Sequence, residues 1–212
     1  NSLITRINNG EDVEVDSMLA TVFETSKQVN QWSDGAFDPS VSPLINLWGF
    51  GYKNYGTPPT QSQIDSALML VGIDSCFIVD NRIKKKHPRT EFNFSAITKG
   101  YGCDMIASMM QQNGCNDFMI EIGGDMVIAG KNPQGKPWRV MIDAPIDNDT
   151  SITHSSAAII EVSDCGIATS GNYRNFRKDK NGKKTGHTIN PKTGHPVITS
   201  TLSATVIAPN AM

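Results

Sequence analysis

The spacing of hydrophobic residues predicts three amphipathic helices. Each follows a side chain that can accept a hydrogen bond at a helix start, namely Asp16, Thr60 and Ser95. The second helix also has Gln63 in the position of a capping box, and we expect Gly72 to end it. The expected buried stripes are Leu19, Val22, Phe23, Ser26, Val29 and Trp32; Ile64, Leu68 and Val71; and Ile97, Tyr101, Met105 and Met109.

The third of these helices is expected to end at Asn113-Gly114, since glycine is common just after a helix C-terminus. We interpret its methionines as core filling, because the flexible thioether fills irregular gaps.

The second half of the chain predicts strands joined by short turns. Gly123-Gly124-Asp125 separates the first two strands at hairpin length. Consecutive strands without intervening helices favour antiparallel pairing, so we predict an α+β fold in a single domain over residues 1–212. The domain would have a mainly antiparallel sheet and about three flanking helices. The expected strands are 118–122, 126–129, 138–142, 157–162 and 202–208.

Composition excludes several classes of function. The chain of 212 residues is 19% charged with net charge −2, so it offers no basic face for nucleic acid. Lys84-Lys85-Lys86, the densest positive cluster, is expected to be the solvated edge of a hairpin. No apolar run reaches the ~20 residues that span a bilayer. The four cysteines form no C-x-x-C pair, which argues against a zinc or redox motif.

The segment from His187 to Gly194 combines a histidine with a tight Pro/Gly turn. The nearby corner Ser170-Gly171-Asn172 could offer backbone N–H groups to an anion. Together they suggest chemistry on a phosphorylated substrate, although an ordinary hairpin turn beside a surface histidine has the same pattern.

Two further segments have candidate phosphate sites. Gly130 to Lys136 resembles a Walker A loop, but Pro137 stands where serine or threonine should be, so we predict a hairpin connection. The helix start from Asn93 to Tyr101 includes Lys99 and could bind a phosphate at its N-terminus. An ordinary capped helix with a surface lysine remains the alternative.

The loop from Gly35 to Ser40 leads into a second glycine- and aromatic-rich stretch, Leu47 to Gly51. Aromatic residues between glycines can form the walls of a site for a flat ring, and Asp38 could bond a ring N–H or a ribose hydroxyl. A loop pinned to the core by its aromatic side chains is equally compatible with this pattern.

Taken in order, these segments resemble the ApbE family, the FAD:protein FMN transferases. Six blocks carry the resemblance across nearly the whole chain, in family order: Asp34 to Val41, Leu47 to Gly51, Ala96 to Tyr101, Ile122 to Asp125, Ala168 to Tyr173 and His187 to Gly194.

The resemblance implies Mg2+-dependent cleavage of FAD, with release of AMP and attachment of FMN to a threonine of an acceptor protein. It implies a flavin site in a cleft between sheet and helices, and a periplasmic or outward-facing location, often through an N-terminal lipid anchor. By the same resemblance His187 would be the catalytic residue. The FAD contacts would be Ala36, Phe37, Asp38, Asn93, Lys99 and Ile189, and the carbonyl of Ala96 would bind the metal.

The chain departs from the family pattern at three places. Asn93 and Asn190 stand where the family usually has aspartate, and the family's metal motif should follow Met212. The chain starts without a methionine at Asn1 and stops at Met212 right after a predicted strand, so we expect both ends of the domain to be incomplete. Two alternatives stay open: an FAD pyrophosphatase that gives FMN and AMP, and an FAD-binding protein without catalysis. A purely structural or interaction protein would leave the glycine-rich corners unexplained. The acceptor protein and the oligomeric state are not predicted.

Overall fold

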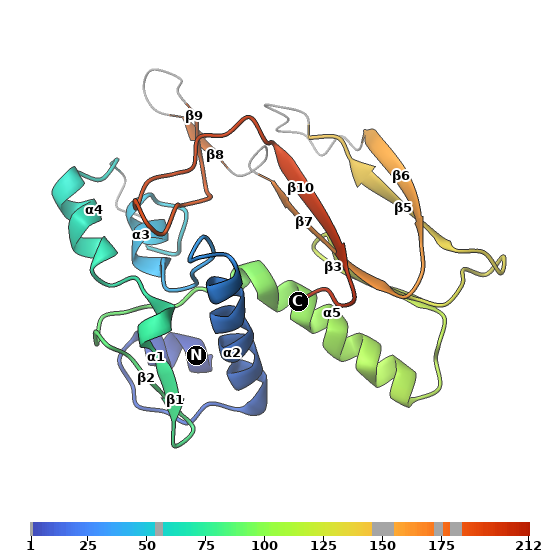
Figure 1. The fold of residues 1–212 in the computed structure, drawn as a ribbon, viewed down its shortest axis with the longest axis horizontal. Coiled ribbons are helices and arrows are strands. Elements are labelled where there is room, and N and C mark those ends of the chain that lie inside the picture. The colour runs from blue at the N-terminus through green and yellow to red at the C-terminus, as the bar shows by residue number, and fades with distance from the viewer. Residues whose placement is uncertain (1, 54–56, 146–154, 172–175, 179–183) are drawn as a thin grey trace. The chain divides into compact units, whose positions relative to one another are not determined.

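The computed structural model describes residues 2–53, 57–145, 155–171, 176–178 and 184–212. Most helices lie in the first half of the chain and most strands follow consecutively in the second half, with antiparallel pairing, which confirms the α+β fold class (Figure 1). The chain forms two units, each built from two stretches: residues 1–96 with 185–198, and residues 97–184 with 199–212. No helix within the described ranges is both long and apolar enough to cross a membrane.

The first unit holds most of the helices, two of which were not predicted. Helices α1 and α3 have six residues each, too few for a hydrophobic period to be recognised. The elements are α1 (Leu3–Asn8), α2 (Ser17–Trp32), α3 (Ser42–Leu47), α4 (Gln61–Leu68), the short 3-10 helix η1 (Ile73–Ser75), β1 (Phe77–Val79) and β2 (Arg82–Lys84).

Helix α2 confirms the predicted start and most of the predicted stripe. The Asp16 carboxylate accepts the Leu19 N–H at 2.7 Å, as expected for an N-cap. Trp32 was wrongly placed on the stripe, because its side chain is 75% exposed. Asn30 is buried instead, and a residue two positions further on points roughly 200° away around the helix axis.

Helix α4 begins as predicted and ends early. The capping box between Thr60 and Gln63 is complete in both directions. The helix ends at Leu68, however, and Gly72 lies beyond it at φ 140°, where it precedes η1. The prediction that Gly72 ends the helix was therefore wrong.

The second unit has one long helix and most of the strands. Residues 95 and 96 of α5 are counted with the first unit. Four strands form a sheet in the order β10-β7-β4-β3, antiparallel throughout, and β5 pairs with β6. The elements are α5 (Ser95–Gln112), β3 (Phe118–Ile122), β4 (Asp125–Ala129), β5 (Trp138–Asp143), β6 (Ser156–Val162), β7 (Cys165–Gly171), β8 (Phe176–Lys178), β9 (Lys184–Gly186, at the boundary of the units) and β10 (Ser203–Ala208).

The hairpin between β3 and β4 follows from its glycines. Ile122 pairs with Asp125, so the loop consists only of Gly123 and Gly124. Both have positive φ, 57° and 93°, which a tight two-residue hairpin requires and glycine adopts without strain. The predicted hairpin is confirmed.

Alternation along β4 places two hydrophobic clusters on the two faces of the sheet. Ala129 packs with Phe118 and with Ala107 of α5. The preceding residue, Ile128, packs with Val140 of β5 and Ile167 of β7. Helix α5 therefore covers one face of the four-stranded sheet, and the β5–β6 ribbon covers the other.

The predicted stripe of α5 was largely wrong. Its buried residues are Ile97, Gly100, Cys103 and Ala107, whereas Met105 and Met109 are 45% and 55% exposed. The methionines therefore do not fill the core at these positions. The helix is apolar around much of its circumference, so periodicity could not identify the face that packs on the sheet.

Two loop predictions need correction. The segment from Gly130 to Lys136 does join two strands, but these strands do not pair with each other, so it is not a hairpin. The Asn132 side chain accepts backbone N–H groups within the loop and donates to a carbonyl. Lys85 is not part of a solvated edge: its ammonium donates to the carbonyls of Ile7 and Thr90, and burial lowers its pKa.

Candidate functional site

The histidine-bearing segment forms a tight turn in the first unit. Ile189 pairs with Pro196 in an antiparallel bridge, and the Val197 N–H donates to the Thr188 carbonyl at 2.8 Å. At the tip, the Asn190 side-chain oxygen accepts the N–H groups of residues 192 and 193. An aspartate would accept the same two bonds, so asparagine here preserves the turn.

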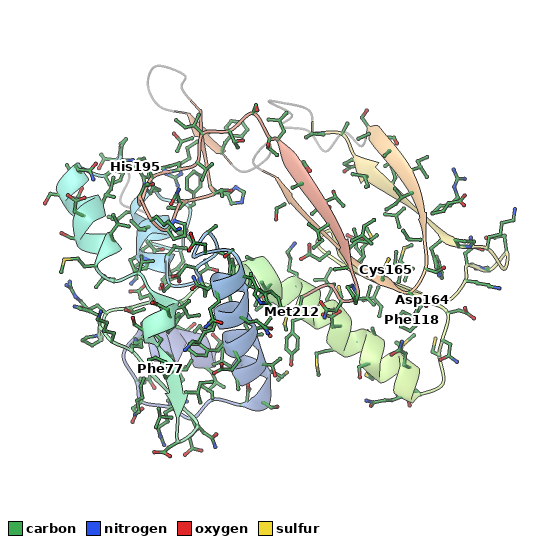
Figure 2. The ribbon with its side chains drawn as sticks, viewed as in Figure 1. Phe77, Phe118, Asp164, Cys165, His195 and Met212 are labelled. Carbon is green, nitrogen blue, oxygen red and sulfur yellow. The ribbon has the colours of Figure 1, made fainter. Side chains whose placement is uncertain are left out.

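The turn is anchored on helices α3 and α4 by its glycine and by a tryptophan. Gly194 has φ +71°, and a Cβ there would lie 2.6 Å from the Cγ2 of Ile64. The Trp48 Nε1–H donates to the Gly194 carbonyl at 2.8 Å, and its ring lies 5.9 Å from that of His195. Figure 2 shows His195 on this turn. Ile189, which belongs to the same turn, is only 7% exposed and packs in a hydrophobic cluster with Leu44 of α3 and Ile64 of α4.

His187 lies at the start of this turn with its ring half-buried. The Phe50 ring meets the imidazole edge-on, with centroids 6.3 Å apart and an interplanar angle of 65°. Phe50 follows Gly49, which has φ +75° and ends α3. The Phe50 N–H bonds to the Ile45 carbonyl and the Gly49 N–H to the Asn46 carbonyl, which is a Schellman C-cap.

The loop that starts at Asp34 lies against the same turn. The end of α2 is also a Schellman cap, with Asp34 and Gly35 at φ 50° and 72°. The Asp34 carboxylate meets the Lys192 ammonium at 2.7 Å, and this ion pair lowers the pKa of Asp34. The structure therefore brings the predicted segments 34–38 and 187–194 together within the first unit.

The predicted FAD contacts in the 36–38 loop differ in accessibility. Ala36 is exposed and Phe37 half-buried, whereas Asp38 is buried at 8% exposure. The Asp38 carboxylate accepts the Ser40 N–H and hydroxyl at one oxygen and the Ile73 N–H at the other. Burial nevertheless raises its pKa. These bonds favour the pinned-loop alternative for Asp38.

Asn93 and Ala96 lie at the start of α5. The Asn93 N–H donates to the Pro39 carbonyl at 2.7 Å, and its side-chain oxygen accepts the Ser95 N–H. Ser95 is thus the first helical residue rather than the cap, and Asn93 supplies the capping bond. Ala96, one residue further along, is exposed.

Lys99 belongs to the second unit, where its surroundings are acidic. Its ammonium donates to the Gly123 carbonyl at 2.9 Å and pairs with the Asp125 carboxylate at 3.2 Å. Asp125 is only 4% exposed. The I-G-G-D block of the sequence therefore binds the predicted phosphate lysine, a contact that spacing along the chain did not reveal.

Two residues of the predicted anion corner lie at the end of a strand. Residues 165–171 form strand β7, and Ser170 and Gly171 pair with Ala204 and Ser203 of β10. Asn172, the last member of that corner, lies outside the described residues.

Among the residues that the structure describes, neither a metal-binding cluster nor the cavity beside α3 and α4 adds to the candidate site. No group of three or more His, Cys, Asp or Glu side chains within those ranges could hold a metal ion. The described residues therefore do not by themselves make a metal centre around Ala96. A cavity of about 500 Å3 opens beside α3 and α4, bordered by Asn46, Lys53 and Glu91, and none of the predicted site residues lines it.

Comparison with known proteins identifies close relatives. The sequence model of the ApbE family matches residues 1–212. The FAD:protein FMN transferase of Salmonella typhimurium is 34% identical and covers 100% of this chain and 61% of its own length. The Vibrio cholerae relative of the same name is 35% identical, with 96% and 60% coverage. The chain thus spans about three fifths of the length of these relatives.

Solved structures agree with this relationship. The flavin transferase ApbE from Vibrio cholerae superposes with a TM-score of 0.82 at 33% identity, covering 98% of this chain and 66% of that one. The apo Pseudomonas stutzeri flavinyl transferase ApbE gives 0.86 at 30% identity, with 99% and 65% coverage.

Proposed function

Because the chain belongs to the ApbE family, we propose that the protein containing it is an FAD:protein FMN transferase. The observation that carries this proposal is the anchored turn that holds His187 against Phe50, next to the loop at residues 34–38. The names of relatives at 34% and 35% identity support the same activity.

The reaction that we propose is a phosphoryl transfer. The hydroxyl oxygen of an acceptor threonine bonds to the phosphorus on the FMN side of the FAD pyrophosphate. The bond from that phosphorus to the bridging oxygen breaks, and AMP leaves with the bonding electrons. The hydroxyl proton passes to an imidazole nitrogen of His187. A threonine hydroxyl is a weak nucleophile at neutral pH, so a general base accelerates the step.

The remaining residues would bind and orient FAD. Ala36 and Phe37 offer accessible surface on the loop, whereas Asp38 would act by holding the loop in shape. Asn93 and the backbone of Ile189 complete the proposed flavin contacts in the first unit. By the family resemblance, Lys99 would supply positive charge to the phosphates.

Mg2+ dependence is part of the proposal on the strength of the family resemblance alone. Ala96 could contribute its carbonyl oxygen, and bound Mg2+ would neutralise charge on a pyrophosphate. We assign no step to the metal, because the described residues include no group of three or more His, Cys, Asp or Glu side chains that could hold it. Loss of transfer on chelation with EDTA, and its return with Mg2+, is the expected result.

The acceptor and the location are also proposals. The acceptor would be a protein with a target threonine, and the enzyme would face the periplasm or the outside of the cell, held by an N-terminal lipid. Fractionation of cells that express the intact protein tests the location, and a cytosolic distribution would contradict it.

A pair of histidine variants tests the catalytic assignment. His187→Ala should lose FMN transfer by about a hundredfold or more, within the range that a general base contributes. His195→Ala is the matched control, because His195 lies on the same turn and its ring contacts only the Trp48 ring among the described interactions. Equal activity of the two variants would remove His187 from the mechanism.

Two other functions remain as measurable outcomes. Release of AMP and free FMN without modification of the acceptor indicates an FAD pyrophosphatase. Tight binding of FAD without any AMP indicates a flavin-binding protein.

A further inference from the structure

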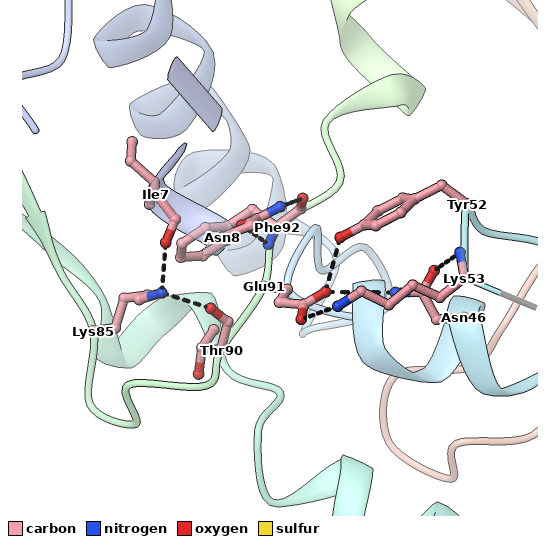
Figure 3. A network of polar contacts seen from close by, with 9 residues as sticks. All are labelled: Ile7, Asn8, Asn46, Tyr52, Lys53, Lys85, Thr90, Glu91 and Phe92. Carbon is pink, nitrogen blue, oxygen red and sulfur yellow. Dashed lines mark hydrogen bonds and ion pairs between the residues drawn. The ribbon is translucent and has the colours of Figure 1, made fainter. Parts of the chain in front are cut away.

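Glu91 lies at the centre of a polar network in the first unit (Figure 3). Its carboxylate meets the Lys53 ammonium at 2.8 Å and the Tyr52 hydroxyl at 3.1 Å. The Asn46 amide approaches the same carboxylate at 3.4 Å. The Glu91 side chain is only 17% exposed, so these contacts are partly shielded from water. All three donors belong to α3 or to the loop that follows it.

The backbone around Glu91 is fixed from two sides. Glu91 pairs with Val41 in a parallel bridge, and Asn93 donates to the carbonyl of residue 39. Between them, the N–H and carbonyl of Phe92 both bond to the side-chain amide of Asn8. The carboxylate therefore projects from a well-supported segment, next to one proposed flavin contact.

The loop after α3 closes around Asn46. The Asn46 side-chain oxygen accepts the Lys53 N–H at 3.3 Å, which draws the end of the loop back to the helix. Gly51 lies directly against this amide, since a Cβ on Gly51 would lie 2.0 Å from the same oxygen. Phe50, whose ring faces His187, lies between the α3 cap and these contacts.

We propose that Glu91 is a positioning residue for flavin transfer: it holds the loop at residues 50–53 so that the Phe50 ring fixes the orientation of the His187 imidazole. The inference rests on the proposed function, because it assigns His187 the role of general base. Glu91 does not touch the reacting groups. Glu91 acts on His187 through the loop at residues 50–53 and its Phe50 ring. The position of the imidazole matters because a general base is effective only when its nitrogen is correctly placed.

The test compares Glu91→Gln and Glu91→Ala in the intact protein. Misplacing a catalytic group by about 1 Å costs up to roughly a hundredfold in rate. Glu91→Ala should therefore lower kcat by roughly ten- to a hundredfold and leave KM for FAD within about twofold. Glu91→Gln keeps an acceptor oxygen and should recover part of the rate. The matched control is Glu11→Gln, which breaks the exposed ion pair with Arg6 at 2.7 Å.

A spectroscopic measurement separates this inference from the activity itself. The imidazole signals of the four histidines are recorded by NMR, and His187→Ala identifies the signal of His187. We expect the Glu91 variants to shift that signal and leave the other three in place. Gly51→Ala, which perturbs the loop from its other side, should shift the same signal.

The outcomes are distinct. A wild-type protein without FMN transfer overturns the proposed function, and the NMR comparison still tests the effect of Glu91 on His187. An unshifted His187 signal in folded Glu91→Gln and Gly51→Ala variants overturns the positioning role. So does an unchanged kcat in an active protein.

Discussion

Replacing Gly194 with alanine should destabilise the first unit by an amount that the local geometry sets. A non-glycine residue in the left-handed region costs about 1–2 kcal/mol, and Gly194 has φ +71°. The new Cβ would also lie 2.6 Å from Ile64 Cγ2 and 3.2 Å from atoms of Leu44 and Leu68. Overpacking of this kind typically costs about 1–3 kcal/mol, which gives a total of about 2–5 kcal/mol.

Gly10→Ala provides the matched control in the same unit. Gly10 has φ +87°, and a Cβ there would meet no atom within 4 Å. Only the backbone cost of about 1–2 kcal/mol should therefore appear. The lower entropy of the unfolded chain with alanine is the same in both variants, so it cancels in the difference.

The assay is urea unfolding followed by far-UV circular dichroism, with the free energy of unfolding extrapolated to water. We expect Gly194→Ala to lose about 1–3 kcal/mol more than Gly10→Ala, the share due to overpacking. Equal losses in the two variants would refute the claim that the turn is seated tightly on α3 and α4.

Three further perturbations test other contacts. Asp38→Asn should cost about 1–3 kcal/mol by leaving the Ile73 N–H without its acceptor. Burial raises the pKa of Asp38, so its carboxyl group holds its proton to higher pH in the native state than in the unfolded state. The free energy of unfolding should therefore fall as pH rises from the unfolded-state pKa towards the folded-state pKa. The Asp38→Asn variant should lack this fall in stability. A pH profile of urea midpoints that is the same in the variant and the wild type would contradict the role of Asp38. Trp48→Phe removes the Nε1–H bond to Gly194 and should cost about 1 kcal/mol beyond the lost packing, whereas a melting temperature equal to wild type would exclude a contribution. Cys76 and Cys103 are 1% and 0% exposed, and burial raises the pKa of both thiols, so iodoacetamide should alkylate them after Cys115 and Cys165, as mass spectrometry would show; early modification of either would contradict its burial.

Local sequence signals predicted the fold where one short pattern decides the structure. The capping side chains Asp16 and Thr60 start their helices as expected, because a cap depends on residues three positions apart. The glycine pair after β3 specifies its hairpin in the same way.

Predictions failed where distant packing decides the structure. Strand β7 was not expected because its small and polar residues lack a clear alternation, and it is defined by pairing with β4 and β10. The buried face of α5 was misassigned because methionines and aliphatic residues surround the helix.

The candidate site shows the same division. The turn at residues 187–194 was recognised from its histidine, proline and glycine, and the structure confirms the turn. The contacts of Glu91, Lys99 and Asp38 join residues far apart in the chain, from 24 positions for Lys99 to 45 for Glu91. No local pattern encodes such pairs, so these contacts could be read only from the folded chain.

The most direct test of the proposed function is one incubation of the intact protein with FAD, Mg2+ and a candidate acceptor that has a threonine. AMP is quantified by chromatography, and the acceptor is weighed by intact-mass spectrometry. The proposal predicts an acceptor mass gain equal to FMN attached with loss of water, in molar proportion to the AMP released. AMP without that mass gain, across acceptors that have known flavinylation threonines, would contradict transfer and leave hydrolysis as the activity.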